Sequence, residues 1–244
     1  MNVEQHRWFS QSLGRDMEVR VYGRGGRALI VFPSQDGRVG DFEGFGMVDA
    51  CGHLLHAGRL TLVTVDGNDW NSWTNRNASP ADRARAHLDY DRYVVEEVFP
   101  FVLGQTGRET CWTTGCSMGA FHAANFFFRR PDLFDGVIGL SGLYDTRGFV
   151  GDFCDENVYF NSPLYYLPGL ADPWYLDRYR KSRIVFAVGQ GAYEEDCLRD
   201  TRALESVLAA KAVPAWFDYW GHDVNHDWPW WRRMLPYFLE KLGV

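Results

Sequence analysis

TTGCSMGAFHAANFF, residues 113–127, places one serine between glycines where a strand-like run meets a helix-like one. Gly115, Ser117 and Gly119 form the pattern G-x-S-x-G, which in this context is typical of a nucleophile elbow, a tight strand-to-helix turn that exposes the serine hydroxyl. Small glycines let the neighbouring backbones approach, and the N-terminus of the following helix favours a developing negative charge. A solvated loop could also place a serine here, but the strand before and the helix after it favour Ser117 as a nucleophile.

Strand-like and helix-like segments alternate along the chain on both sides of this turn. The apolar runs ALIVF (28–32) and GVIGL (136–140) suit strands that are buried on both faces. This alternation predicts an α/β fold, a mostly parallel central sheet with helices on both faces, in which ligands bind beyond the C-terminal ends of the strands. One helix is predicted from Ser79, its cap, through 105, and Pro100 is expected to kink or end it.

Residues 142–182 interrupt the alternation with prolines, glycines and many aromatic residues. The segment is too long for a plain connection. We interpret it as a cap-like insertion that folds over the strand ends, within a single α/β-hydrolase domain spanning residues 1–244. The alternative is ordinary loop structure packed by its own aromatic side chains.

Composition limits the class of protein. The 25 Lys and Arg against 32 Asp and Glu give a net charge of −7, and no basic cluster interrupts that balance, so nucleic acid is not an expected partner. No apolar run reaches about 18 residues and the N-terminus lacks the apolar core of a signal peptide, so no membrane partner is expected.

The irregularly spaced cysteines Cys51, Cys111, Cys116, Cys154 and Cys197 indicate reduced thiols in a cytoplasmic protein. No zinc-ligand spacing occurs, and neither a metal nor an organic cofactor is expected. Cys116 is the one candidate for a catalytic thiol, but its neighbour Ser117 explains the local sequence better.

A nucleophilic serine needs a base, which in α/β hydrolases comes late in the chain, after the acid. His222 and His226 both follow the last predicted strand. His226 directly precedes a helix start, where Asp227 can cap the helix and Pro229 can occupy its first turn. This favours His226, since a catalytic imidazole needs a fixed backbone.

The acid should follow the strand RIVFAVG (183–189). The next segment, QGAYEEDCLRD, offers several carboxylates. Asp196 is expected to be the helix cap, which leaves Glu194 and Glu195 on the loop. We favour Glu194, with Glu195 and with Asp145, after an earlier strand, as alternatives.

Two backbone N–H groups should form an oxyanion hole. Met118 N–H, next after the nucleophile, is the first. The second should come from the loop PSQDG (33–37). Pro33 has no N–H, so Ser34 or Gln35 must supply it, and we favour Gln35.

Several quoted segments carry a resemblance: FSQSLGRDMEVRVYG (9–23), IVFPSQDGRVGDFEGFG (30–46), the elbow with its helix, and HDWPWWRRMLPYFL (226–239). Together they resemble the putative-esterase branch of the α/β hydrolases, which includes esterase D, feruloyl esterases, enterochelin esterases and mycolyltransferases. In that family the catalytic histidine typically precedes Asp/Thr-Trp-x-x-Trp, which maps to His226, and the elbow maps to Ser117. The longer ending GHDVNH and the acidic run YEED depart from the family pattern, so His222 and the choice of acid stay open.

The expected activity is hydrolysis of a small-molecule carboxylic ester through an acyl-enzyme on Ser117. An acyltransferase that uses the same acyl-enzyme is one alternative. A non-catalytic binding protein on a hydrolase fold is another. The sequence leaves self-association open.

Overall fold

A computed structural model describes residues 3–244 and contains one eight-stranded sheet in the order β1-β2-β4-β3-β5-β6-β7-β8. From β4 onward all neighbouring strands are parallel, whereas β1 and β2 form an antiparallel hairpin that adds to the β4 edge. The mostly parallel α/β sheet predicted from the sequence is thus confirmed. Its strands are β1 (Val3–Ser10), β2 (Arg15–Tyr22), β3 (Arg27–Phe32), β4 (Leu60–Val65), β5 (Cys111–Cys116), β6 (Phe134–Leu140), β7 (Arg183–Val188) and β8 (Trp216–Tyr219).

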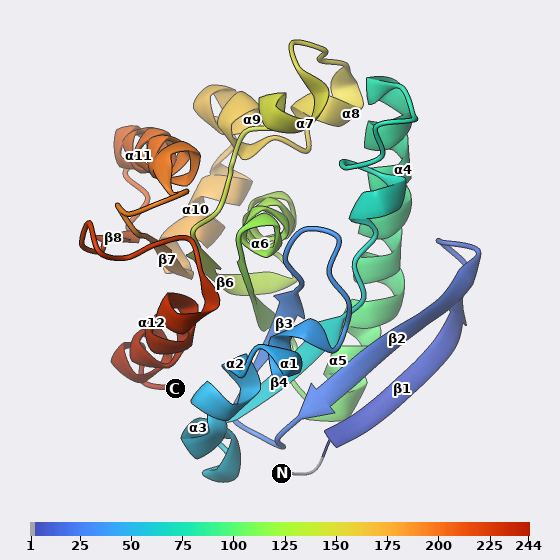
Figure 1. Ribbon diagram of the computed structural model, residues 1–244, viewed down its shortest axis with the longest axis vertical. Coiled ribbons are helices and arrows are strands. Elements are labelled where there is room, and N and C mark those ends of the chain that lie inside the picture. The colour runs from blue at the N-terminus through green and yellow to red at the C-terminus, as the bar shows by residue number, and fades with distance from the viewer. Residues whose placement is uncertain (1–2) are drawn as a thin grey trace.

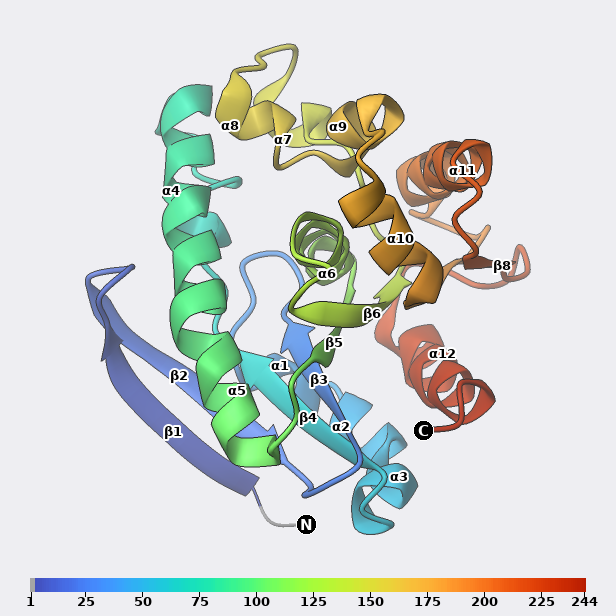
Figure 2. The ribbon, with the colours of Figure 1, turned by 180° about the vertical axis from the view of Figure 1, so that it is seen from behind.

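Helices cover both faces of this sheet (Figures 1 and 2). Short helices and the last helix cover one face: α1 (Asp41–Gly44), α2 (Met47–Ala50), α3 (Gly52–His56) and α12 (Trp228–Lys241). The other face carries α4 (Pro80–Arg92), η2 (Tyr93–Val98), α5 (Phe99–Thr106), α6 (Met118–Arg129), α9 (Pro163–Gly169), α10 (Pro173–Lys181) and α11 (Glu195–Ala210). The remaining short helices are η1 (Asp69–Asn71), α7 (Arg147–Val150) and α8 (Glu156–Tyr159).

The apolar run 28–32 in strand β3 is buried on both faces of the sheet. Ile30 and Phe32 pack into the core beneath α6, and Leu29 and Val31 pack into the core beneath α12. Successive side chains of a strand point to opposite faces, so a strand covered on both faces has no solvent-facing position for a polar residue.

The helix expected over 79–105 begins as predicted, since Ser79 accepts a hydrogen bond from the Asp82 N–H and Pro80 is its first residue. Of the two expected effects of Pro100, a kink or an end of the helix, the end does not occur. The helical path continues to Thr106, and both views show α4, η2 and α5 as one rod (Figures 1 and 2). The π-helical turn η2, in which hydrogen bonds span five residues, ends at Val98, two residues before Pro100. Its irregular hydrogen-bond ladder accommodates a residue that has no N–H to donate.

The aromatic-rich segment 142–182 forms four helices, α7 to α10. Its Val150 and Val158 pack with Met118 and Phe121 in a small buried cluster beside the start of α6. The segment therefore contacts the elbow region, and its role as a cap stays a prediction. Among residues 3–244, no helix combines the length and the apolar character needed to cross a membrane.

Candidate active site

Ser117 lies in the turn between β5 and α6, with φ 57° and ψ −121°. This positive-φ backbone costs a non-glycine residue about 1–3 kcal/mol, and such strain persists only where the surroundings enforce it. The two glycines make the enforcement possible. A Cβ on Gly115 would lie 2.4 Å from Gly119 backbone atoms, and a Cβ on Gly119 would lie 2.4 Å from the carbonyl oxygen of Phe32. The strand, the turn and the helix are therefore packed more closely than any side chain would allow.

His226 reaches this serine from the loop between β8 and α12. Its Nε2 lies 2.9 Å from Ser117 Oγ. The His226 N–H donates to the Ala192 carbonyl at 3.0 Å. The Asp227 side chain caps α12 by accepting from the Trp228 N–H, as the sequence predicted. The Trp231 indole and the imidazole pack at right angles, with a centroid distance of 5.0 Å. The backbone and the ring of His226 are thus both held in place.

Glu194 faces the other ring nitrogen. Its Oε2 lies 3.2 Å from His226 Nδ1, and its Oε1 accepts from Ser141 Oγ at 2.6 Å. Trp231 Nε1–H donates in turn to Ser141 Oγ at 3.0 Å. Glu194 is fully buried, so these partners replace the water that a carboxylate otherwise requires. Ser117, His226 and Glu194 therefore form one hydrogen-bonded series.

The alternative base and the two alternative acids lie away from the Ser117 hydroxyl. His222 is exposed, with Nδ1 3.4 Å from the Gln190 carbonyl. Glu195 is exposed. Asp145 is buried and pairs with Arg147. None of the three joins the hydrogen-bonded series of Ser117.

The expectation that Asp196 caps the helix is wrong. Glu194 occupies the cap position of α11 without a side-chain cap bond, and Asp196 sits in the first turn, where it pairs with Arg199. The helix begins at Glu195, earlier than expected, so Glu195 and Asp196 both lie inside it. The Glu194 carboxylate turns inward to His226 and Ser141, so it is not free to bond the helix N–H groups.

The expected oxyanion donors lie on the two backbones that meet at Ser117. Met118 is the first residue of α6, and Gln35 lies in the loop after β3. Ser34 Oγ donates to the Cys116 carbonyl at 3.1 Å, which ties this loop to the elbow. Within residues 3–244, the N–H groups of Gln35 and Met118 donate to no other group of the protein. Both are therefore free to bind an oxygen.

Cys197 lies near the base and, together with Glu194 and His226, offers side-chain atoms that could bind a metal ion. Its Sγ lies 3.9 Å from His226 Nδ1, and with a Glu194 oxygen these atoms lie within 4.8 Å of one another. Burial raises the pKa of the Cys197 thiol well above its usual range. Two members of this group, Glu194 and His226, already hydrogen-bond Ser141 and Ser117.

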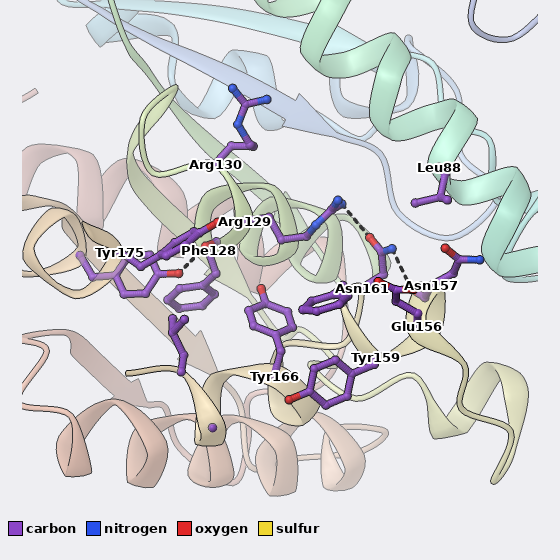
Figure 3. A pocket seen from close by; sticks show the side chains of 14 residues that line it. Leu88, Phe128, Arg129, Arg130, Glu156, Asn157, Tyr159, Asn161, Tyr166 and Tyr175 are labelled. Atoms are coloured by element: carbon purple, nitrogen blue, oxygen red, sulfur yellow. Dashed lines mark hydrogen bonds between the residues drawn. The ribbon is translucent and has the colours of Figure 1, made fainter. Parts of the chain in front are cut away.

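A separate cavity of about 610 Å³ lies at the far end of α6, between that helix and the segment 156–179 (Figure 3). Phe128 on its wall is roughly 16 Å along the helix from Ser117. Arg129 there already donates to Asp91 and Asn161, and Arg130 pairs with Asp132. The cavity is therefore distinct from the site at Ser117.

A parallel α/β sheet with a strained serine between a strand and a helix, and a histidine on its hydroxyl, defines the class of α/β-hydrolase serine enzymes. The family model described as "Putative esterase" matches residues 10–242, and the chain belongs to this family. The protein is accordingly a carboxylic ester hydrolase.

Solved structures show the same fold. A ferulic acid esterase matches with a TM-score of 0.77 and 19% identity, covering 99% of this chain and 97% of that one. An S-formylglutathione hydrolase from Agrobacterium tumefaciens matches with a TM-score of 0.75 and 13% identity, covering 98% of this chain and 93% of that one. Mycobacterium tuberculosis MPT51 (FbpC1) matches with a TM-score of 0.72 and 15% identity, covering 99% of this chain and 98% of that one. No curated protein sequence matches the chain.

Proposed function

We propose that the protein hydrolyses a carboxylic ester through an acyl-enzyme on Ser117, with His226 as the base and Glu194 as the acid that orients it. The observation that carries the proposal is the hydrogen-bonded series from Ser117 Oγ to His226 Nε2 and from His226 Nδ1 to Glu194. A carboxylate on Nδ1 holds the imidazole in the tautomer that accepts a proton at Nε2 and stabilises the imidazolium that forms.

In the first half-reaction, Ser117 Oγ attacks the ester carbonyl carbon while its proton passes to His226 Nε2. The carbonyl oxygen becomes an oxyanion, to which the N–H groups of Met118 and Gln35 donate hydrogen bonds. The bond to the leaving oxygen then breaks, and the leaving alkoxide takes the proton from His226. The acyl group remains as an ester on Ser117.

In the second half-reaction, water gives a proton to His226 and attacks the acyl carbon. The oxyanion forms again between the same two N–H groups. When it collapses, the bond to Ser117 Oγ breaks, and the serine recovers its proton from His226. The products are one carboxylic acid and the free enzyme.

The substrate that we propose is a small ester with an apolar or aromatic group. The support is the buried apolar cluster beside the elbow, which includes Trp73, Met118 and Phe121 and is packed against Phe149 and Tyr165. The similar ferulic acid esterase is consistent with an aromatic acyl group. The five cysteines are free, which supports the cytoplasmic location that we include in the proposal.

The acyl-enzyme is tested by intact mass spectrometry during turnover of p-nitrophenyl acetate. The wild type should gain one acetyl group, and Ser117→Ala should gain none. Ser206→Ala, which removes an exposed serine on α11, should be acetylated like the wild type. Acetylation of Ser117→Ala, or none of the wild type, would refute the proposal. Adding methanol separates the fates of the acyl group, since preferential methyl ester formation would favour an acyltransferase over a hydrolase.

A further inference from the structure

A second, fully enclosed histidine–carboxylate pair lies one helical turn behind the nucleophile. His122 on α6 places Nε2 2.8 Å from Asp69 Oδ1, with side-chain exposures of 2% and 1%. Among the described residues, neither side chain hydrogen-bonds to Ser117, His226 or Glu194. An imidazole and a carboxylate are seldom both buried unless their hydrogen bonds serve a purpose.

The second oxygen of Asp69 shows what the pair holds. Asp69 Oδ2 accepts from the backbone N–H of Asp36 at 3.3 Å. The Asp36 N–H belongs to the peptide group that joins Gln35 to Asp36. This bond therefore fixes the peptide plane next to the Gln35 N–H, the proposed oxyanion donor. Asp36 also has a positive φ of 55°, which is unfavourable for a residue with a Cβ. Its side chain accepts a further bond from Thr74 Oγ1 at 2.6 Å.

The loop is therefore strained and held from outside. The Gly37 N–H donates to the Ser34 carbonyl at 2.9 Å, which closes a turn around Gln35 and Asp36, and Ser34 Oγ donates to the Cys116 carbonyl. From outside this turn, only Asp69 and Thr74 hydrogen-bond to Asp36 among the described residues. His122 orients Asp69 from helix α6, the same helix whose first N–H belongs to Met118. One helix thus carries the first oxyanion donor and, through His122 and Asp69, sets the place of the second.

We propose that His122 and Asp69 are positioning residues for the oxyanion hole: they hold the Gln35–Asp36 peptide so that the Gln35 N–H points at the developing oxyanion. This inference rests on the proposed function, because it presumes that Gln35 and Met118 bind that oxygen. It concerns transition-state binding, since the oxyanion exists only after the serine has attacked.

The test compares His122→Leu, which removes the donor, with His122→Gln, whose amide N–H can reach Asp69 from a similar position. His122→Leu should lower kcat for p-nitrophenyl acetate by about 10- to 100-fold. Complete loss of one oxyanion donor lowers kcat by about 10²–10³-fold, and here the donor is misplaced but still present. KM should change less than about threefold, since the ground-state ester makes little use of this donor. His122→Gln should recover most of kcat. Binding of phenylboronic acid, which forms a tetrahedral adduct on a serine, should weaken in parallel with kcat.

His87→Leu is the matched control. His87 is also buried, and its ring stacks on His122 at 5.5 Å, but it makes no hydrogen bond to Asp69. If His87→Leu lowers kcat as much as His122→Leu does, the effect is one of packing and the inference is wrong. It is also wrong if a folded His122→Leu keeps kcat within about twofold of the wild type, or if only KM changes.

A measurement without turnover separates this inference from the proposed function. In amide hydrogen exchange by NMR, the Asp36 N–H should exchange faster in His122→Leu than in the wild type and His87→Leu. Unchanged Asp36 exchange overturns the inference while Ser117→Ala still reports on the proposed function. An active Ser117→Ala enzyme overturns the proposed function and the inference with it.

Discussion

Ser141 and Glu194, 53 residues apart, share a 2.6 Å hydrogen bond in the interior, and neither is exposed to solvent. Ser141 lies just after β6, and its hydroxyl also accepts from Trp231 on α12. The bond leaves Glu194 Oε2 directed at His226. The orientation of the candidate acid therefore depends on three separate parts of the chain.

Because of this arrangement, Glu194→Gln should lower kcat by on the order of 10²–10⁴-fold, less than the loss of the nucleophile, since the acid orients the base but does not attack. The exposed neighbour Glu195→Gln should stay within about twofold of the wild type. Steady-state hydrolysis of a p-nitrophenyl ester by both variants, together with Asp145→Asn, measures this. A larger loss from either of the other two variants would assign the acid differently.

Ser117→Ala should leave the fold intact, because it removes only the hydroxyl of a half-buried residue in the turn. It should reduce esterase activity by roughly 10⁴-fold or more. Circular dichroism checks the fold, and hydrolysis of a p-nitrophenyl ester checks the activity. Near wild-type turnover by this variant would mean that another group is the nucleophile.

His226→Ala should abolish turnover, whereas His222→Ala should retain most of it, because only His226 lies on the Ser117 hydroxyl. Steady-state hydrolysis of a p-nitrophenyl ester by both variants measures this difference. An active His226→Ala enzyme with an inactive His222→Ala enzyme would reverse the assignment.

Thiol reactivity should single out Cys154. It is exposed, whereas burial raises the pKa of Cys51 to about 12 and raises those of Cys111, Cys116 and Cys197 well above the usual range. Because the thiolate is the reactive form, Ellman's reagent should react quickly with one thiol per native chain and with all five after denaturation. Cys154→Ser should show no fast phase. Two or more fast thiols in the native wild type would contradict the burial.

Glu97 should make stability depend on pH. Burial by itself would raise its pKa, but bonds from the Ser12 N–H, the Trp8 indole and the Ser10 hydroxyl outweigh it and hold the pKa below its ordinary 4.5. A lowered folded-state pKa stabilises the protein above the unfolded value, and this stabilisation is lost as pH falls through the folded value.

Glu97→Gln should therefore cost about 1–2 kcal/mol of unfolding free energy at pH 7. The cost should shrink as the pH falls from the ordinary value of 4.5 through the lower folded-state pKa, where the wild-type carboxylate itself becomes protonated. Urea unfolding at pH 7 and at an acidic pH in this range measures the difference. Glu96→Gln, on the exposed neighbour, is the control and should show little effect at either pH. An equal cost at both pH values would contradict the role of the charge.

Short local residue patterns predicted the fold class, the turn at Ser117 and the start of the last helix. The turn at Ser117 is encoded by two glycines within five residues, and the start of α12 by Asp227 and Pro229 next to His226. The strands of the central sheet are continuous apolar runs because both of their faces are covered. Fold class, elbow and the preferred histidine all follow from such short patterns.

Pro100 shows where a short pattern was not enough. The rule that proline ends a helix holds for a regular hydrogen-bond ladder, and η2 makes this ladder irregular just before the proline. No local residue pattern indicated that turn. Its Tyr93, Val94 and Val98 are all buried against the sheet, so tertiary packing accompanies the irregular ladder.

The sequence by itself determined the α/β order of elements, the serine at its turn and a short set of acids and bases. Only the tertiary structure distinguished Glu194 from Glu195, which are adjacent in the chain but face inward and outward at the start of α11. It alone brought Ser141 to Glu194, and Asp69 to His122 across 53 residues. The physical reason is that a hydrogen bond depends on where two atoms lie in space, and for residues so far apart the packing of the sheet and its helices decides that.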